Sequence, residues 1–259
     1  MISGGLLHGR GIVITRPAAQ AKALAGLIEG HGARAILFPV IAILDVADPG
    51  RLNEIIDRLD MYDAAIFISP NAVNQSMTAI LARRALPQNL DMIAIGGGSA
   101  RALREHGVDL VIVPKGRYDS EALLAVPELG EVSGKRIVIF RGEGGRPLLG
   151  DTLAARGARV EYAECYRRIK PDGDVTTLMH AWSRGEIDGI VATSSEGLRN
   201  LHEMLDAAGR DRLAATAVFV PHARIAATAR ELGLASAVVT PPGDEGIAAG
   251  IVAHFSAAR

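Results

Sequence analysis

Small and hydroxylated residues recur where short apolar runs give way to helical stretches. Such turns expose backbone amides at a helix start, where unpaired N–H groups and the helix dipole favour carboxylate or phosphate. Ser and Thr also cap ordinary helices, so any one turn has a purely structural explanation. Several turns at strand ends together predict a site for a ligand with multiple anionic groups. The turns are Thr15-Arg16-Pro17, Ser69-Pro70-Asn71, Gly97-Gly98-Ser99, Thr193-Ser194-Ser195 and Pro221-His222.

A glycine-rich loop carries two further cationic groups. Arg141 and Gly142 open the segment RGEGGRP, which follows an apolar run and leads into a helical stretch. The guanidinium groups and flexible glycines predict a loop that faces an anion, although a surface loop with Arg146 in water is the alternative. Tyr166 lies farther on, where its hydroxyl could reach a ligand or its ring could pack in the core.

Motifs for familiar cofactors and nucleophiles are missing from the sequence. The run Gly96-Gly97-Gly98 lacks dinucleotide-binding spacing, and GEVSGKR is one residue short of a phosphate-binding loop. The chain has no GxSxG, HExxH or CxxC segment. Its one cysteine, Cys165, cannot form an internal disulfide, and the scattered histidines form no metal-ligand cluster. We therefore expect an activity without cofactor or metal.

Length and charge limit the remaining classes. At 259 residues the chain is long enough for two domains. Its 28 basic and 29 acidic side chains give a net charge of −1, which argues against a nucleic-acid or polybasic membrane surface. The longest apolar run, Ala35 to Leu44, is too short to span a bilayer, and the N-terminus lacks a signal-peptide core. We expect a cytoplasmic protein.

Short β-branched runs alternate with Ala- and Leu-rich helical stretches, which predicts an α/β fold with parallel sheets. Helices are expected to begin near Pro17, Pro70, Ser99, Ser120, Pro147, Ser195, His222 and Glu245. The expected strands are Gly11 to Thr15, Arg34 to Phe38, Ala64 to Ile68, Met92 to Ile95, Leu110 to Val113, Arg136 to Phe140, Arg159 to Ala163, Gly189 to Ala192, Val218 to Val220 and Ala237 to Val239.

Two distant parts of the chain carry the same order of elements. The segment IFISPNAV resembles VATSSEGL, with Ser69 opposite Ser194, and ARALREHG resembles AATARELG. This weak repeat predicts two related α/β domains, one inserted in the other. We place the first domain at residues 1–38 and 171–259 and the inserted domain at 39–170. Two crossovers would form a hinge, with a ligand in the cleft between the domains.

Several segments, in this order, resemble the uroporphyrinogen-III synthase family: ITRP, FISPNAV, IAIGGGSARALREHGV, RGEGGRPLL, ECYRR, VPHARIAATARELG and PPGDEGIAAGI. The resemblance implies two flavodoxin-like three-layer domains joined by a two-stranded linker. It also implies a monomeric, cofactor-independent lyase of tetrapyrrole biosynthesis. Such an enzyme closes hydroxymethylbilane with inversion of ring D and loss of water. The bilane could be handed over by hydroxymethylbilane synthase.

The resemblance also implies roles for individual residues. Tyr166 is the candidate to assist departure of the substrate hydroxyl. Carboxylates of the substrate are expected at the turns, mainly on backbone amides. The expected contacts are Thr15, Arg16, Ser69, Pro70, Asn71, Ser99, Arg141, Gly142, Ser194, Ser195 and His222.

Two other interpretations fit the same elements. A hinged two-domain binding protein or ligand sensor has this architecture, but it needs a secretion signal or a DNA-binding unit, and neither is visible in the sequence. A flavodoxin-like FMN protein is the other alternative, and a colourless purified sample would exclude it.

Overall fold

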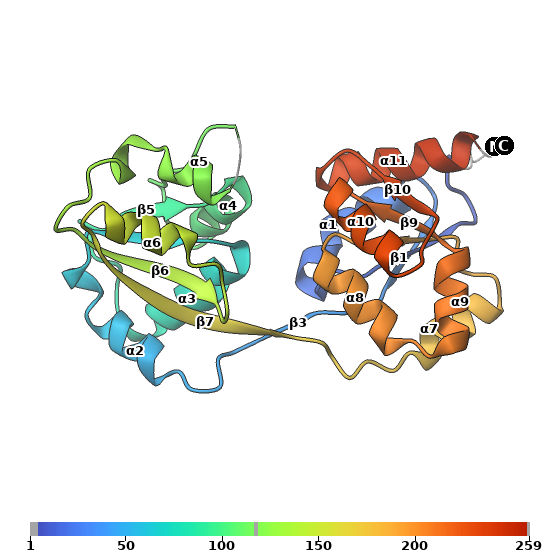
Figure 1. Cartoon of the computed structure of the whole chain (residues 1–259), viewed down its shortest axis with the longest axis horizontal. Helices are drawn as coiled ribbons and strands as arrows, with labels where there is room; N and C mark the ends of the chain where they lie inside the picture. The colour runs from blue at the N-terminus through green and yellow to red at the C-terminus, as the bar shows by residue number, and fades with distance from the viewer. Residues whose placement is uncertain (1–4, 117–118, 258–259) are drawn as a thin grey trace. The chain divides into compact units, whose positions relative to one another are not determined.

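The computed structural model describes residues 5–116 and 119–257. The chain divides into two compact units, each built on a five-stranded sheet flanked by helices (Figure 1). The first unit comprises the chain up to Ala42 and from Ile169 onward, and the second comprises Ile43–Arg168. The boundaries expected from the sequence were 38/39 and 170/171.

The first unit has the strand order β10-β9-β8-β1-β2, and its neighbouring strands all pair in parallel. Its inner strands β8 and β1 are fully buried, in keeping with the apolar residues that form them. The strands are β1 (Gly11–Ile14), β2 (Arg34–Leu37), β8 (Gly189–Val191), β9 (Ala217–Val220) and β10 (Ala237–Val239).

Helices cover both faces of this sheet. Leu24 and Ile28 of α1 pack with Ile251 and Phe255 of α11 against Phe219, forming one continuous apolar core. The helices of the unit are α1 (Ala18–Gly30), α7 (Thr176–Ser183), α8 (Ser195–Met204), α9 (Ala207–Ala215), α10 (Ala223–Glu231) and α11 (Gly243–Ala257).

The second unit has the strand order β3-β7-β6-β4-β5. Its strands are β3 (Ala42–Leu44), β4 (Ala64–Phe67), β5 (Asp91–Ala94), β6 (Arg136–Gly142) and β7 (Arg159–Ile169). The strand expected over Leu110–Val113 is wrong, because only Ile112 forms a bridge, to Ile93. Leu110 is 88% exposed, so the segment leaves the sheet edge before a ladder forms.

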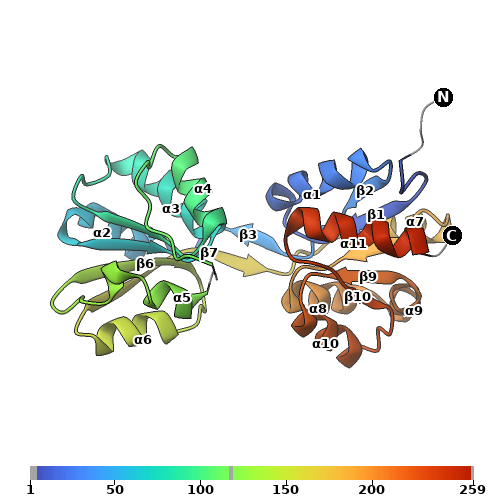
Figure 2. The ribbon, with the colours of Figure 1, turned by 90° about the horizontal axis from the view of Figure 1, so that it is seen from above.

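Helices flank this sheet on two sides (Figure 2). One face packs against α2, α3 and α4, and the other packs against α5 and α6. The elements are α2 (Gly50–Asp57), α3 (Pro70–Arg83), α4 (Gly97–Glu105), α5 (Ser120–Leu124) and α6 (Leu148–Ala155), with short 3-10 turns at Leu59–Met61 and Pro127–Leu129. Thus β4 and the stretch Ile137–Phe140 of β6 are buried on both faces, which explains their unbroken apolar sequences.

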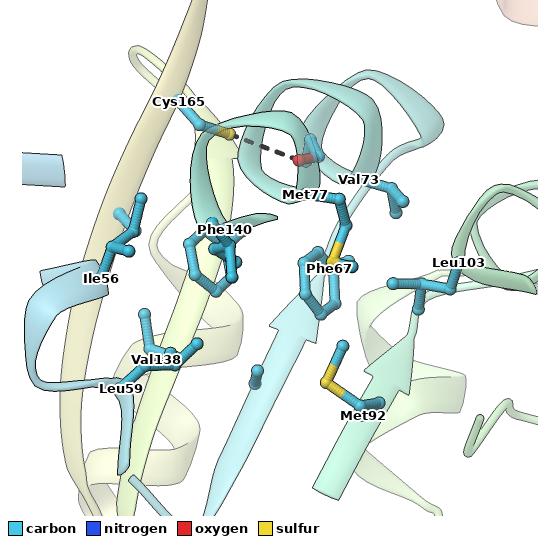
Figure 3. Packing of buried hydrophobic residues seen from close by; sticks show 14 of the residues in the cluster. Ile56, Leu59, Phe67, Val73, Met77, Met92, Leu103, Val138, Phe140 and Cys165 are labelled. Carbon is cyan, nitrogen blue, oxygen red and sulfur yellow. Dashed lines mark hydrogen bonds between the residues drawn. The ribbon is translucent and has the colours of Figure 1, made fainter. Parts of the chain in front are cut away.

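The core beneath α3 centres on two stacked rings. Phe67 and Phe140 lie 4.9 Å apart between ring centroids, as neighbouring strands place them in register (Figure 3). Cys165 faces the same core, and its thiol donates to the carbonyl of Ala72 at 3.6 Å. Burial raises the pKa of Cys165 to about 12, so the thiol stays protonated and acts as a packing group.

The predicted repeat is confirmed in the elements. Helix α4 (97–105) plus 126 gives α10 (223–231), and β5 (91–94) plus 126 gives β9 (217–220). An offset of 125 relates β4 at residue 64 to β8 at residue 189, and α3 at residue 70 to α8 at residue 195. The succession β4-α3-β5-α4 therefore recurs as β8-α8-β9-α10, with α9 as an additional helix before β9.

Helices α3, α5 and α8 begin at the residues expected, Pro70, Ser120 and Ser195. The other expected starts fall within two residues of the observed ones. Sequence reasoning missed α2, α7 and α9, which lie between strands already assigned. In the described part of the chain, no helix has the length and apolar character needed to cross a membrane.

A surface ion-pair cluster gives the first unit a pH-dependent element. Hydrogen bonds from Arg184 and Arg34 lower the pKa of Glu186 to about 2 from 4.5. A lowered pKa stabilises the fold above the unfolded value, and this contribution is lost as pH falls from about 4.5 towards 2. We expect Glu186→Gln to lose less stability between pH 7 and pH 3 than the unaltered chain, measured by urea unfolding. An equal loss in both proteins would contradict the assignment.

Candidate functional site

The second unit contains a pocket of about 320 Å³ beyond the carboxyl ends of β4, β5 and β6. This is the edge at which open parallel sheets bind ligands. Three of the residues expected from the sequence line it: Ser69, Arg141 and Tyr166. Two more guanidinium groups, from Arg146 and Arg168, line the same pocket.

Ser69 and Tyr166 form the polar end of this pocket. Ser69 caps α3 by accepting from the amide of Ala72 at 3.0 Å, and its hydroxyl lies 3.2 Å from the Tyr166 hydroxyl. Tyr166 is 4% exposed, so its ring is fixed by packing. The ring lies against Gly142, where a β-carbon would approach Tyr166 Cζ to 2.6 Å. The glycine of the RGEGGRP loop thus makes room for the phenol.

Arg141 is held by several neighbours of different kinds. Its Nη2 donates to Glu164 Oε1 at 3.0 Å, and its Nη1 donates to the carbonyl of Gly145 at 3.1 Å. The guanidinium carbon lies 3.8 Å from the centroid of the Tyr162 ring, a cation–π geometry. The Arg141 Nε is buried and has no hydrogen-bond partner among the described residues.

The lining of the pocket favours anions. Within the described part of the chain, it includes three arginines and no Asp or Glu. One of these charges, on Arg141, is balanced by Glu164 behind it. Backbone amides at the start of α3 lie beside the same pocket residues, since α3 begins directly after Ser69. The combination can bind a carboxylate and place a phenol hydroxyl next to it.

At the corresponding edge of the first unit, three of the expected contact residues form hydrogen bonds within the unit. Ser194 caps α8 by accepting from the amide of Gly197 at 2.9 Å, as Ser69 does for α3. Thr15 is buried and donates to the carbonyl of Val191 at 2.8 Å. Ser195 accepts from the hydroxyl of Thr228 at 2.9 Å. His222 is exposed at the N-cap of α10, with no side-chain capping bond.

Arg16 is also anchored within the first unit. Its Nε donates to Thr193 Oγ1 at 3.2 Å, and its Nη1 pairs with Asp244 at 2.5 Å. The side chain is 16% exposed. Arg16 therefore lies at a strand end as expected, with its hydrogen-bonding capacity partly used inside the unit.

Not every expected contact residue faces solvent. Ser99 is 2% exposed, so its hydroxyl is not presented to a ligand in this state, although the amides at the start of α4 remain on the same turn. Pro70 is exposed and Asn71 is partly buried on α3, and neither lines the pocket. Sequence reasoning missed Arg168 and Tyr162. Arg168 lies two residues beyond Tyr166 on β7, a spacing that places both on one strand face.

The Arg16–Thr193 bond can be tested by removing one hydroxyl. We expect Thr193→Val to lower the free energy of unfolding by about 1–2 kcal/mol, because the Arg16 Nε loses its acceptor while staying mostly buried. Urea unfolding measures the change. The control is Thr78→Val on the exposed face of α3, expected within about 0.5 kcal/mol of the unaltered chain. Equal effects at both positions would contradict this role for Thr193.

Comparison with solved structures supports the fold. A uroporphyrinogen III synthase mutant from the extremely thermophilic bacterium Thermus thermophilus matches with a TM-score of 0.61 and 23% identity, covering 96% of this chain and 98% of that one. The Helicobacter pylori 26695 synthetase matches with a TM-score of 0.62 and 15% identity, covering 95% and 99%. These matches show a shared fold.

Comparison with known sequences identifies the family as well as the fold. The synthase of Escherichia coli (strain K12) is 34% identical over 224 residues, which are 86% of this chain and 91% of the relative. A putative synthase of Methanothermobacter thermautotrophicus is 30% identical over 197 residues, covering 74% and 77%. The family model for uroporphyrinogen-III synthase HemD matches residues 22–247. The chain therefore belongs to the uroporphyrinogen-III synthase family.

Proposed function

We propose that this chain closes hydroxymethylbilane to uroporphyrinogen III, with inversion of ring D and loss of water, as a cofactor-independent lyase. The observation that carries the proposal is the pocket of the second unit, in a member of this family. There a phenol hydroxyl on Tyr166, the capping hydroxyl of Ser69 and three guanidinium groups line one pocket. That set fits a ligand that has several carboxylates and one hydroxyl to lose.

In the proposed reaction the substrate's own pyrrole rings supply the electrons for each bond change, so the protein needs no covalent intermediate. The C–O bond of the hydroxymethyl group breaks, and pyrrole electrons stabilise the resulting azafulvene. The substituted carbon of ring D attacks it to form a spiro intermediate, which fragments and recloses with ring D reversed. The hydroxyl leaves as water, and the last proton is lost from the ring carbon. Tyr166 would assist the first step by donating a hydrogen bond to the departing oxygen.

Control of conformation is the larger task. The bilane also closes unaided to the symmetric isomer I, so the protein must hold one geometry in preference to another. We propose that carboxylates of the substrate are held by the amide-bearing turns after β4, β5, β8 and β9, and by Arg141 near the end of β6. Local contacts of this kind accommodate a polyanion on a chain of net charge −1.

We also propose a domain arrangement for the chain. The first unit, read as β2-β1-β8-β9-β10, follows the flavodoxin-like order, and the second unit interrupts it in sequence. Both chain crossings, near Ala42 and Ile169, involve β3 or β7, which are neighbours in one sheet. These features support two flavodoxin-like domains, one inserted in the other, with a two-stranded linker. We further propose a cytoplasmic monomer that receives its bilane from hydroxymethylbilane synthase.

The test generates hydroxymethylbilane in the assay and determines the isomers of the oxidised porphyrins with and without the chain. Isomer III in excess only when the chain is present is the expected result. Isomer I alone in both samples would overturn the proposal, and tight ligand binding without turnover would favour the binding-protein interpretation.

A further inference from the structure

The internal repeat pairs the two strand-end arginines. In the first unit β1 lies beside β8, with Ile12 opposite Gly189. In the second unit β6 lies beside β4, with Ile137 opposite Ala64. Ile12 and Ile137 are 125 residues apart in the sequence, and so are Ala64 and Gly189, so β1 corresponds to β6 and β8 corresponds to β4. The same shift relates Arg141 to Arg16 and Ile68 to Thr193.

This equivalence bears on the Arg141 Nε, which is buried and has no hydrogen-bond partner among the described residues. In the first unit the Arg16 Nε donates to Thr193 Oγ1 at 3.2 Å. In the second unit the equivalent position is Ile68, whose side chain carries no acceptor. The Arg141 Nε is consequently buried with no hydrogen-bond partner in the described part of the chain. A buried donor left in this state is costly, and it is relieved when a ligand supplies the acceptor.

We propose that the Arg141 Nε binds a carboxylate oxygen of the substrate, at the position where Thr193 supplies an acceptor in the first unit. Arg141 and Ile68 both line the pocket that contains Tyr166 and Ser69. Ile68 is thus a specificity-determining residue, because it withholds an internal acceptor and leaves the donor to the ligand. This inference rests on the proposed function and names one contact in its site.

The surroundings favour a carboxylate over a neutral acceptor. A hydrogen bond from a guanidinium group to a carboxylate is stronger than one to a neutral oxygen. Arg146 and Arg168 line the same pocket and add positive charge. Nη2 donates one of its two N–H groups to Glu164 and Nη1 donates one of its two to the Gly145 carbonyl, whereas the single N–H of Nε has no partner among the described residues. A β-carbon at position 145 would lie 3.2 Å from Arg141 Cδ and 3.7 Å from Arg141 Nε, so glycine there leaves the space beside Nε without a side chain.

The test compares Ile68→Thr with Ile68→Val, two side chains of nearly the same shape that differ by one hydroxyl. We expect the threonine variant to satisfy the Arg141 Nε internally. Its melting temperature should be about 2–6 °C above that of the valine variant. Its KM for hydroxymethylbilane should be about 5- to 10-fold higher than that of the valine variant, with similar kcat.

An NMR titration tests the Arg141 Nε contact without relying on turnover. The ¹⁵N–¹H signal of the Arg141 Nε, assigned by its loss in Arg141→Lys, is followed during titration with uroporphyrin III. We expect a shift in the valine variant at a ligand concentration at least about fivefold lower than in the threonine variant. Equal KM values and equal titration curves for the two variants would overturn the inference. Isomer I alone from the unaltered chain would instead overturn the proposed function.

Discussion

Replacing Tyr166 by Phe is expected to lower kcat about 10- to 100-fold while the protein stays folded and some turnover remains. The variant removes only the hydroxyl, which lies in the pocket 3.2 Å from Ser69 Oγ. The ring, which is 4% exposed and packed on Gly142, is retained. Because the pyrroles supply the electrons, loss of one hydrogen bond to the leaving oxygen should slow dehydration without preventing it. Steady-state kinetics on generated hydroxymethylbilane measures the effect.

The matched control for this variant is Tyr62→Phe. Tyr62 is also buried, and its hydroxyl donates to Glu161 Oε1 at 2.9 Å, away from the pocket residues. Burial raises the pKa of Tyr62 to about 12, so it remains a neutral donor. We expect Tyr62→Phe to retain kcat. Complete inactivity of a folded Tyr166→Phe protein would contradict a reaction governed by positioning.

The second large effect is expected from Gly142→Ala. A β-carbon at this position would lie 2.6 Å from Tyr166 Cζ and 2.7 Å from Cε2. The ring is buried and cannot simply swing into solvent, so either the strand or the ring must shift. We expect a loss of about 1–3 kcal/mol in the free energy of unfolding. We also expect kcat to fall at least as far as in Tyr166→Phe, because the phenol is displaced.

Gly26→Ala provides the same chemical change without the clash. Gly26 lies inside α1, and among the described residues no atom beyond its chain neighbours and the nearby helix backbone lies within 4 Å of the β-carbon it would gain. Alanine there should raise the free energy of unfolding by about 0.5–1 kcal/mol, because it favours the helix. If Gly142→Ala keeps the unaltered kcat, the placement of Tyr166 against that glycine has no part in the reaction.

The regular elements were largely predictable because buried parallel strands have unbroken apolar sequences. Residues 64–67 and 189–191 illustrate this, since each strand is short, fully buried and made of small or apolar residues. Leu110–Val113 has the same apolar character, but it lies at a sheet edge and forms one bridge. Composition does not distinguish an edge segment from an inner strand. Helices α2 and α7 were missed because loops of several residues separate them from the preceding strands β3 and β7, and α9 was missed because it follows another helix.

The site was partly predictable for a related reason. Ser69, Arg141 and Tyr166 follow or extend neighbouring strands, so parallel topology brings them to one edge. Ser99 shares the expected turn chemistry, yet its side chain points into the packed side of α4. Helix rotation of this kind depends on tertiary packing. The unsatisfied Arg141 Nε was also beyond prediction, because it follows from comparing the hydrogen bonds of two equivalent turns.

The central claim is that strand-end turns hold the tetrapyrrole by its carboxylates, mainly through backbone amides. A crystal structure of the chain with uroporphyrin III bound tests it most directly. We predict carboxylate oxygens within hydrogen-bond distance of amides at the starts of α3 and α8, with one on Arg141 Nε beside Tyr166. A tetrapyrrole bound away from the Ser69–Tyr166 pocket, or held chiefly by charged side chains, would contradict the claim.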